Sequence, residues 1–192
     1  MEIRILKGQS REETKATVSE IMRLVNVFPE DMRADYRDPP YFRKQLLNPE
    51  NICIGCYNSD GEMTGFLLAM SQNEAWKELS HYDPDFEKDP DDLTYYVEVM
   101  MSDSKKNRDS NRSSFYMINE LIREADSRGK RFISMHALRN EGLSYVIMTV
   151  YPAELVRERV VMPDLYGPDE EFDYLVADIW EYKKRHRKKF AA

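Results

Sequence analysis

A cationic connection near the middle of the chain joins two segments of different character. The apolar segment LTYYVEVMM (residues 93–101) is typical of a buried strand, and FYMINELIREA (residues 115–125) is typical of an amphipathic helix. Between them lie four cations: Lys105, Lys106, Arg108 and Arg112. The first turn of a helix exposes unpaired N–H groups at the positive end of the helix dipole, which favours phosphate. The pattern indicates a pyrophosphate site, although a solvated polar loop would have the same composition.

The other residue types that could carry chemistry are few. Cys53 and Cys56 form a C-x-x-C pattern, but their segment reads as a strand, in which residues three apart point to opposite faces. We therefore expect two buried, small apolar side chains and not a redox or zinc site. The three histidines are well separated, and neither H-E-x-x-H nor Gly-x-Ser-x-Gly occurs. The sequence favours no metal cofactor and no acyl hydrolase.

Composition indicates one globular domain of 192 residues with 42% apolar side chains. The sequence has neither a membrane-length apolar run nor a secretory signal, so we expect a cytoplasmic protein without a membrane partner. The formal net charge is −7, but residues 181–192 carry six Lys and Arg against one Glu. We predict a domain over residues 1–180 followed by a basic tail. The acidic body argues against nucleic acid as the main partner.

Hydrophobic spacing and end signals predict an alternation of strands and helices. The expected strands cover residues 2–6, 51–57, 63–70, 93–101, 131–137, 153–162 and 172–180. The expected helices cover residues 11–28, 39–47, 73–80, 113–128 and about 140–150. Strand 93–101, helix 113–128 and strand 131–137 form a βαβ unit, whereas the second and third strands form a hairpin. The predicted fold class is α/β, with a central mixed β-sheet and helices on both faces.

This order of elements resembles the GCN5-related N-acetyltransferase (GNAT) superfamily from Glu2 to about Trp180. In that family, a central strand leads into an acetyl-CoA pyrophosphate loop of pattern [Gln/Arg]-x-x-Gly-x-[Gly/Ala] that opens a helix. Residues 108–113, RDSNRS, fall in register with the pattern, with Asn111 and Ser113 in place of the two glycines. Gly65 corresponds to the usual glycine of the hairpin strand, and Asn140 to the residue that leads the family's next helix.

The resemblance implies a GNAT-like acyl-CoA N-acyltransferase fold and acetyl transfer from coenzyme A to a primary amine. Glu98, inside the central strand, is the candidate base for the amine proton, and Tyr145 is a weaker candidate acid for the leaving thiolate. Each could instead be a buried structural group that is only hydrogen-bonded. The backbone of Val99, Met100 and Met101 would hold the pantetheine arm. The remaining expected acetyl-CoA contacts are Lys106, Arg108, Asn111, Arg112, Ser113, Ser114 and Asn140.

Three functions remain open from the sequence. The first is an acetyl-CoA-dependent N-acetyltransferase; the six acids of residues 83–92 would favour a cationic acceptor, either a small molecule or a protein lysine, and a homodimer is possible. The second is a catalytically silent GNAT-like binding or regulatory module, which the replaced glycines favour. The third is an interaction protein that docks through its basic tail.

Overall fold

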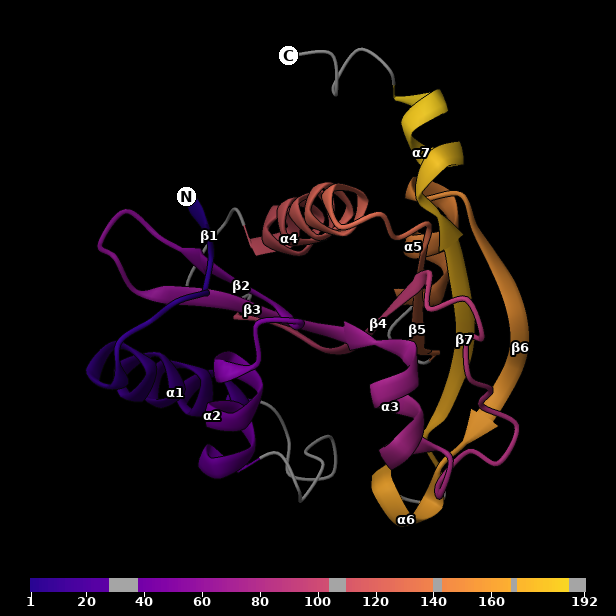
Figure 1. Cartoon of the computed structure of the whole chain (residues 1–192), viewed down its shortest axis with the longest axis horizontal. Helices are drawn as coiled ribbons and strands as arrows, with labels where there is room; N and C mark the ends of the chain where they lie inside the picture. The colour runs from indigo at the N-terminus through magenta and orange to yellow at the C-terminus, as the bar shows by residue number, and fades with distance from the viewer. Residues whose placement is uncertain (28–37, 104–109, 140–142, 167–168, 187–192) are drawn as a thin grey trace. The chain divides into compact units, whose positions relative to one another are not determined.

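The computed structural model describes residues 1–27, 38–103, 110–139, 143–166 and 169–186 (Figure 1). The strands are β1 (Glu2–Ile5), β2 (Ile52–Tyr57), β3 (Met63–Ser71), β4 (Thr94–Ser102), β5 (Phe132–Leu138), β6 (Ala153–Val161) and β7 (Glu171–Asp178). The helices are α1 (Arg11–Val25), α2 (Pro39–Leu47), α3 (Gln72–Leu79), α4 (Ser110–Ser127), α5 (Leu143–Val150), α6 (Pro163–Tyr166) and α7 (Ile179–Arg185).

The strands form a seven-stranded mixed sheet in the order β1-β2-β3-β4-β5-β7-β6. β2 and β3 are an antiparallel hairpin, whereas β4 and β5 pair in parallel, with Thr94 opposite Phe132 and Tyr96 opposite Ser134. Because α4 connects these two parallel strands, the predicted βαβ unit and mixed α/β class are confirmed.

The chain divides into two compact units. Unit 1 contains residues 1–70 and 98–124, and unit 2 contains residues 71–97 and 125–192. β4 and α4 therefore each continue from one unit into the other.

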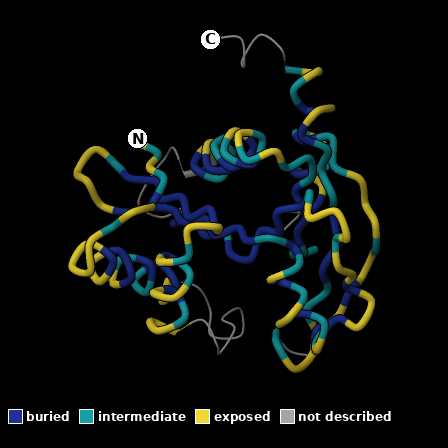
Figure 2. Tube along the Cα trace, viewed as in Figure 1, coloured by how far each residue is buried: buried dark blue, intermediate teal, exposed yellow. Residues whose placement is uncertain are grey.

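In unit 1, α1 and α2 lie on one side of strands β1–β3, and α4 lies on the other (Figure 1). Strands β2 and β3 are buried along almost their whole length, as the dark blue tube of Figure 2 shows. Fully buried side chains from both helical layers and the strands form the core: Ile21, Leu24, Phe42, Phe66, Met117 and Leu121. Cys53 and Cys56 are buried in this core, as predicted, and are not joined in a disulfide.

Unit 2 is built on antiparallel strands β5, β7 and β6, which α5 contacts. Phe86, from the segment that precedes β4, is 1% exposed and packs edge-on against Tyr96 and Tyr174. Both tryptophans of the chain belong to this unit, and a cation covers each indole. Lys88 Nζ lies 4.0 Å from the ring centroid of Trp76, and Arg131 Cζ lies 4.8 Å from that of Trp180.

Local capping signals explain where several helices begin. Ser10 and Glu13 form the expected capping box of α1, and the Asp38 side chain accepts from the Tyr41 N–H at the start of α2. The prediction of a strand up to Trp180 was wrong at its end. Asp178 accepts hydrogen bonds from the backbone N–H groups of Trp180 and Glu181, so β7 ends there and α7 begins.

Two further boundaries differ from the expected ones. α4 begins at Ser110, three residues earlier than predicted, so Arg112 lies in its first turn. α7 includes residues 181–185 of the predicted basic tail, whereas residues 187–192 lie outside the described part of the chain.

Candidate active site

Glu98 lies in the middle of β4 and is 8% exposed. Tyr41, at the start of α2, donates its hydroxyl to Glu98 Oε1 over 3.3 Å. The Asp38 cap fixes the first turn of α2 and with it the position of Tyr41. A buried carboxylate with a hydroxyl donor can accept a proton and return it, as a general base must. Sequence reasoning did not find Tyr41, because nothing local connects residues 57 positions apart.

The end of β4 lies close against β3. A Cβ atom added to Gly65 would come within 3.3 Å of the Met101 carbonyl oxygen and of Cys56 Cβ, and within 3.0 Å of Met117 Cε. The Asp103 N–H donates to the Thr64 carbonyl over 2.9 Å, which continues this contact beyond β4. Val99 and Met101 are buried and Met100 is half-buried. A side chain at this position of β3 would therefore make its neighbours shift by a few tenths of an ångström, at the segment expected to hold pantetheine.

The first turn of α4 is tied back to the end of β4. The Ser113 and Ser102 hydroxyl oxygens lie 2.6 Å apart, and Ser113 is 1% exposed. Arg112 is exposed and Ser114 is half-buried. Asn111 belongs to the helix, so its backbone has a conformation that any L-residue can adopt. Lys106 and Arg108 lie outside the described residues.

The two remaining candidates belong to the segment that follows β5. Tyr145, on α5, is 72% exposed, so its ring is not a packed core side chain. Its exposure leaves the phenol accessible to a partner from solution. Asn140 lies outside the described residues.

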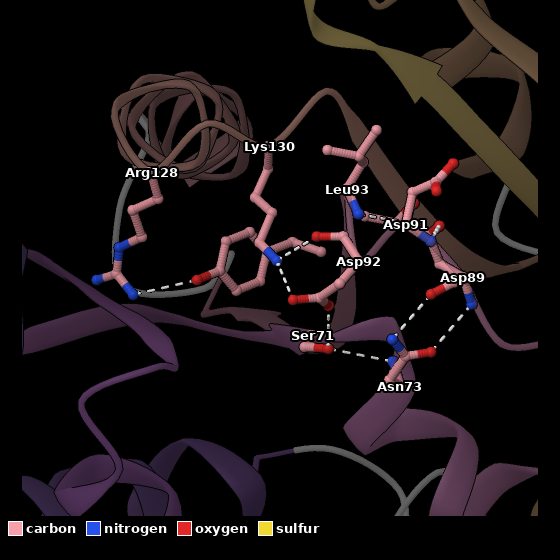
Figure 3. Close-up of polar contacts among 10 residues, drawn as sticks. Ser71, Asn73, Asp89, Asp91, Asp92, Leu93, Arg128 and Lys130 are labelled. Carbon is pink, nitrogen blue, oxygen red and sulfur yellow. Dashed lines mark hydrogen bonds and ion pairs between the residues drawn. The ribbon is translucent and has the colours of Figure 1, made fainter.

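Half of the acidic residues in 83–92 are engaged in internal structure. Asp89 accepts from the N–H groups of Asp91 (3.1 Å) and Leu93 (2.7 Å), and from the Thr94 hydroxyl (2.6 Å). Its backbone N–H and carbonyl pair with the Asn73 amide, as Figure 3 shows. The Asp89 carboxylate therefore shapes the turn into β4 and is not free to attract a ligand.

Asp92 and Asp83 have cationic partners. The Asp92 carboxylate lies 2.7 Å from Lys130 Nζ and accepts from the Ser71 hydroxyl over 2.8 Å (Figure 3). Burial alone would raise the pKa of Asp92, but these hydrogen bonds hold that pKa below its usual range. Asp83 is buried in an ion pair with Arg157. The exposed acids of the segment are Asp85, Glu87, Asp91 and Asp92, of which Asp92 is paired with Lys130.

The part of the chain that the structure describes has neither a metal-binding cluster nor a membrane-spanning helix. The described residues hold no group of three or more His, Cys, Asp or Glu side chains arranged to bind a metal ion. Among the helices in the described ranges, none is both long and apolar enough to cross a membrane.

Comparison of structures, and not of sequences, relates the fold of this chain to known proteins. No protein-family model matches the chain, and no curated protein matches it in sequence. Among solved structures, it is similar to the aminoglycoside 6'-N-acetyltransferase from Enterococcus faecium, with 15% identity and a TM-score of 0.62 over 93% of this chain and 97% of that one.

Two further solved structures have the same arrangement. An aminoglycoside 6'-N-acetyltransferase complexed with coenzyme A matches with 14% identity and a TM-score of 0.63, over 93% of this chain and 97% of that one. The ribosomal-protein-S18-alanine N-acetyltransferase from Escherichia coli matches with 11% identity and a TM-score of 0.60, over 93% and 94% of the two chains. The chain shares one fold with these proteins.

Proposed function

We propose that this chain, which has the fold of the GCN5-related N-acetyltransferases, transfers an acetyl group from acetyl-CoA to a primary amine. The observation that carries the proposal is the structural match over 93% of the chain, which includes a protein complexed with coenzyme A. The buried Glu98 carboxylate in β4 supports it, because it supplies a base within the strand where the resemblance expects one.

In this proposal, Glu98 accepts a proton from the amine nitrogen as that nitrogen attacks the acetyl carbonyl carbon. The carbon–sulfur bond breaks, and the departing thiolate takes a proton for which the exposed Tyr145 hydroxyl is the candidate donor. The backbone of Val99, Met100 and Met101 would hold the pantetheine arm.

The pyrophosphate would bind at the start of α4. Because the Ser113 hydroxyl is paired with Ser102, we assign the first-turn N–H groups and the exposed Arg112 as main contacts there. The other contributors in the proposal are Lys106, Arg108, Asn111, Ser114 and Asn140.

A cationic acceptor is the class we propose, either a small polyamine-like molecule or a protein lysine. The support is the exposed carboxylates of Asp85, Glu87 and Asp91, since Asp83, Asp89 and Asp92 are engaged internally. Exposed charges of one sign raise the local concentration of an oppositely charged substrate.

Calorimetry with acetyl-CoA, followed by thiol release across a panel of primary amines, tests the proposal. We expect acetyl-CoA to bind and at least one cationic amine to release coenzyme A faster than the buffer control does. Failure of acetyl-CoA to bind would overturn it.

The same experiment distinguishes the proposed enzyme from a second candidate, a silent GNAT-like module that binds the cofactor without turnover. The observation in its favour is that side chains replace both motif glycines, at Asn111 and Ser113. A third candidate, docking through the basic tail, has less support, because Lys183 is paired with Asp126 and Lys184 with Glu181. A steep loss of affinity for an acidic partner with salt would favour it.

A further inference from the structure

The candidate base Glu98 is hydrogen-bonded to a side chain from a different element of the same unit. Tyr41 lies in the first turn of α2, and its hydroxyl donates to Glu98 Oε1 over 3.3 Å. Both residues belong to unit 1. Glu98 is 8% exposed, and Tyr41 is half-buried. The contact therefore joins a helix to the strand that carries the candidate base, inside one compact unit.

The backbone of Tyr41 has little freedom, because the first turn of α2 is restricted in two ways. Pro39 and Pro40 occupy the first two helical positions, and the Asp38 side chain accepts from the Tyr41 N–H over 2.8 Å. A proline ring holds φ at about −65°, which suits a helix, and the missing N–H would have no partner within the helix at these positions. The cap and the two prolines together fix where Tyr41 begins.

The ring of Tyr41 is also fixed, by a chain of edge-on aromatic contacts. Its centroid lies 5.4 Å from that of Phe42 at an interplanar angle of 78°. Phe42 in turn packs edge-on against Phe66 of β3, and both phenylalanines are 0% exposed. Edge-to-face contacts favour particular relative orientations of aromatic rings. Backbone and ring therefore both direct the Tyr41 hydroxyl at the Glu98 carboxylate.

A glutamate that acts as a base needs such a partner. Its side chain has several rotatable bonds, and a misplacement of about 1 Å in a reacting group can lower a rate by about 10²-fold. The Tyr41–Glu98 separation of 3.3 Å is longer than the usual O–H···O distance of about 2.7–2.8 Å. Hydrogen bonds of catalytic groups often tighten only in the complex with substrate, so this length is compatible with a role in the reaction.

We propose that Tyr41 is a positioning residue of the acetyl transfer, and that its hydroxyl holds the Glu98 carboxylate in the orientation in which it accepts the amine proton. This inference rests on the proposed function. The amine proton moves to Glu98 while the carbon–nitrogen bond forms and the carbon–sulfur bond breaks. Tyr41 keeps its own proton throughout and acts only through its hydrogen bond to Oε1. Asp38 acts one step further back, because it caps the turn that carries Tyr41.

The role is tested with Tyr41→Phe, with Tyr57→Phe as the matched control. Tyr57 is another tyrosine of unit 1, 9% exposed, whose ring is covered by the Arg4 guanidinium on β2's other neighbour, β1. We expect Tyr41→Phe to lower kcat for a primary amine by about tenfold, less than loss of the base itself. Its dissociation constant for acetyl-CoA should stay within about twofold of the parent, as should both quantities in Tyr57→Phe. Thiol release and calorimetry measure the two quantities.

A double-mutant cycle with Glu98→Gln distinguishes positioning from a structural role. In the Glu98→Gln background, Tyr41→Phe should cause almost no further loss of kcat, because there is no carboxylate left to position. A residue that only stabilises the fold would lower kcat by the same factor in both backgrounds. Equal factors in the two backgrounds, or a kcat of Tyr41→Phe equal to that of the parent, would overturn the inference.

Substitutions of Asp38 test the same role from the backbone. Asp38→Ala removes the cap, whereas Asp38→Asn keeps it, because asparagine caps helices about as well as aspartate does. We expect Asp38→Ala to lower kcat several-fold and Asp38→Asn to restore it to within about twofold of the parent. Equal losses in the two variants would show that the charge of Asp38 matters and would overturn its part as a cap.

The two proposals fail in different ways. If the parent acetylates no amine, the proposed function fails and takes the role of Tyr41 with it. If the parent acetylates amines and Tyr41→Phe retains full kcat, only the role of Tyr41 fails.

Discussion

The hydroxyl oxygens of Ser102 and Ser113 lie 2.6 Å apart and join the last residue of β4 to the first turn of α4. Ser113 occupies the position where the GNAT loop pattern has Gly or Ala. In this chain that position carries a buried hydroxyl, which is hydrogen-bonded to Ser102 at the end of β4. The serine that replaces the glycine therefore has a structural role. The N–H groups in the first turn of α4 remain the proposed contacts for pyrophosphate.

The two serines should be energetically coupled. We expect Ser113→Ala to lower the free energy of unfolding by about 1 kcal/mol, because it removes the hydrogen bond between the buried Ser113 hydroxyl and the half-buried Ser102 hydroxyl. Ser102→Ala and the double variant complete a double-mutant cycle in chemical denaturation, which should give a coupling of about 0.5–1.5 kcal/mol. Ser114→Ala, one residue further on, serves as control for the cycle. Strictly additive effects of the two substitutions would contradict the coupling.

Glu98→Gln should impair turnover and leave acetyl-CoA binding almost unchanged. Loss of a general base typically lowers the rate by about 10²–10⁴-fold, whereas the amide keeps the shape of the side chain. Thiol release measures the rate, and calorimetry measures the dissociation constant. Tyr41→Phe removes the 3.3 Å hydrogen bond to Glu98 but keeps the Glu98 carboxylate, so it should have a much smaller effect. Turnover of Glu98→Gln equal to that of the parent would show that Glu98 is structural.

Substitutions of Asp89 and Asp91 should differ sharply in their effect on the free energy of unfolding, although the two residues are neighbours in one acidic segment. Asp89→Asn weakens the acceptor of three hydrogen bonds and should lower the free energy of unfolding by about 1–3 kcal/mol. Asp91→Asn, at an exposed side chain, should change it by no more than about 0.5 kcal/mol. Thermal and chemical denaturation of the two variants measure the difference. Similar losses would mean that the network in Figure 3 contributes little.

The exposed acids should affect the acceptor and not the fold. Changing Asp85, Glu87 and Asp91 together to Asn, Gln and Asn should raise the KM for a polycationic amine and flatten its salt dependence, since exposed charges act over about 8 Å at physiological salt. Neutral acceptors and acetyl-CoA affinity provide the internal control. An equal rise in KM for cationic and neutral amines would rule out electrostatic steering by these residues.

Asp83 should make part of the stability of the protein sensitive to acid. Its pKa is lowered in the folded state from a reference value of 3.8, so the stabilisation is present above about pH 4 and is lost as the pH falls through the folded value. Asp83→Asn should lower the free energy of unfolding by about 3 kcal/mol at neutral pH, because it breaks a buried pair. The gap between parent and variant should narrow below about pH 4. Asp85→Asn, at an exposed carboxylate, controls for the change in net charge, and a gap independent of pH would contradict the assignment.

Most of the element order was predictable because its signals are local. Each signal lies within a few residues of the element that it predicts. Examples are the Ser10–Glu13 capping box of α1, the Asp38 cap of α2 and the apolar runs of the β2–β3 hairpin. The end of β7 was misjudged because the apolar pattern continues through Ile179 and Trp180, while the Asp178 side chain caps a helix. The apolar pattern favoured a longer strand and the Asp178 cap favoured a helix, and it is the helix that forms.

The pairing of functional side chains was not predictable in the same way. Tyr41 meets Glu98, and Asp83 meets His136 and Arg157, across 53 to 74 positions of sequence. Such contacts depend on strand order and register, which no local pattern specifies. The acidic segment shows the same limit, because its composition does not reveal that Asp89 and Asp92 satisfy internal donors.

The location of both tryptophans in unit 2 has a practical consequence for any unfolding experiment on this chain. Intrinsic indole fluorescence, from Trp76 beneath Lys88 and Trp180 beneath Arg131, reports on residues 71–97 and 125–192 alone. Far-ultraviolet circular dichroism, in contrast, also follows α1, α2 and most of α4 in unit 1. Superimposable melting curves from the two optical probes would indicate one cooperative transition, whereas separated curves would resolve the two units without any label.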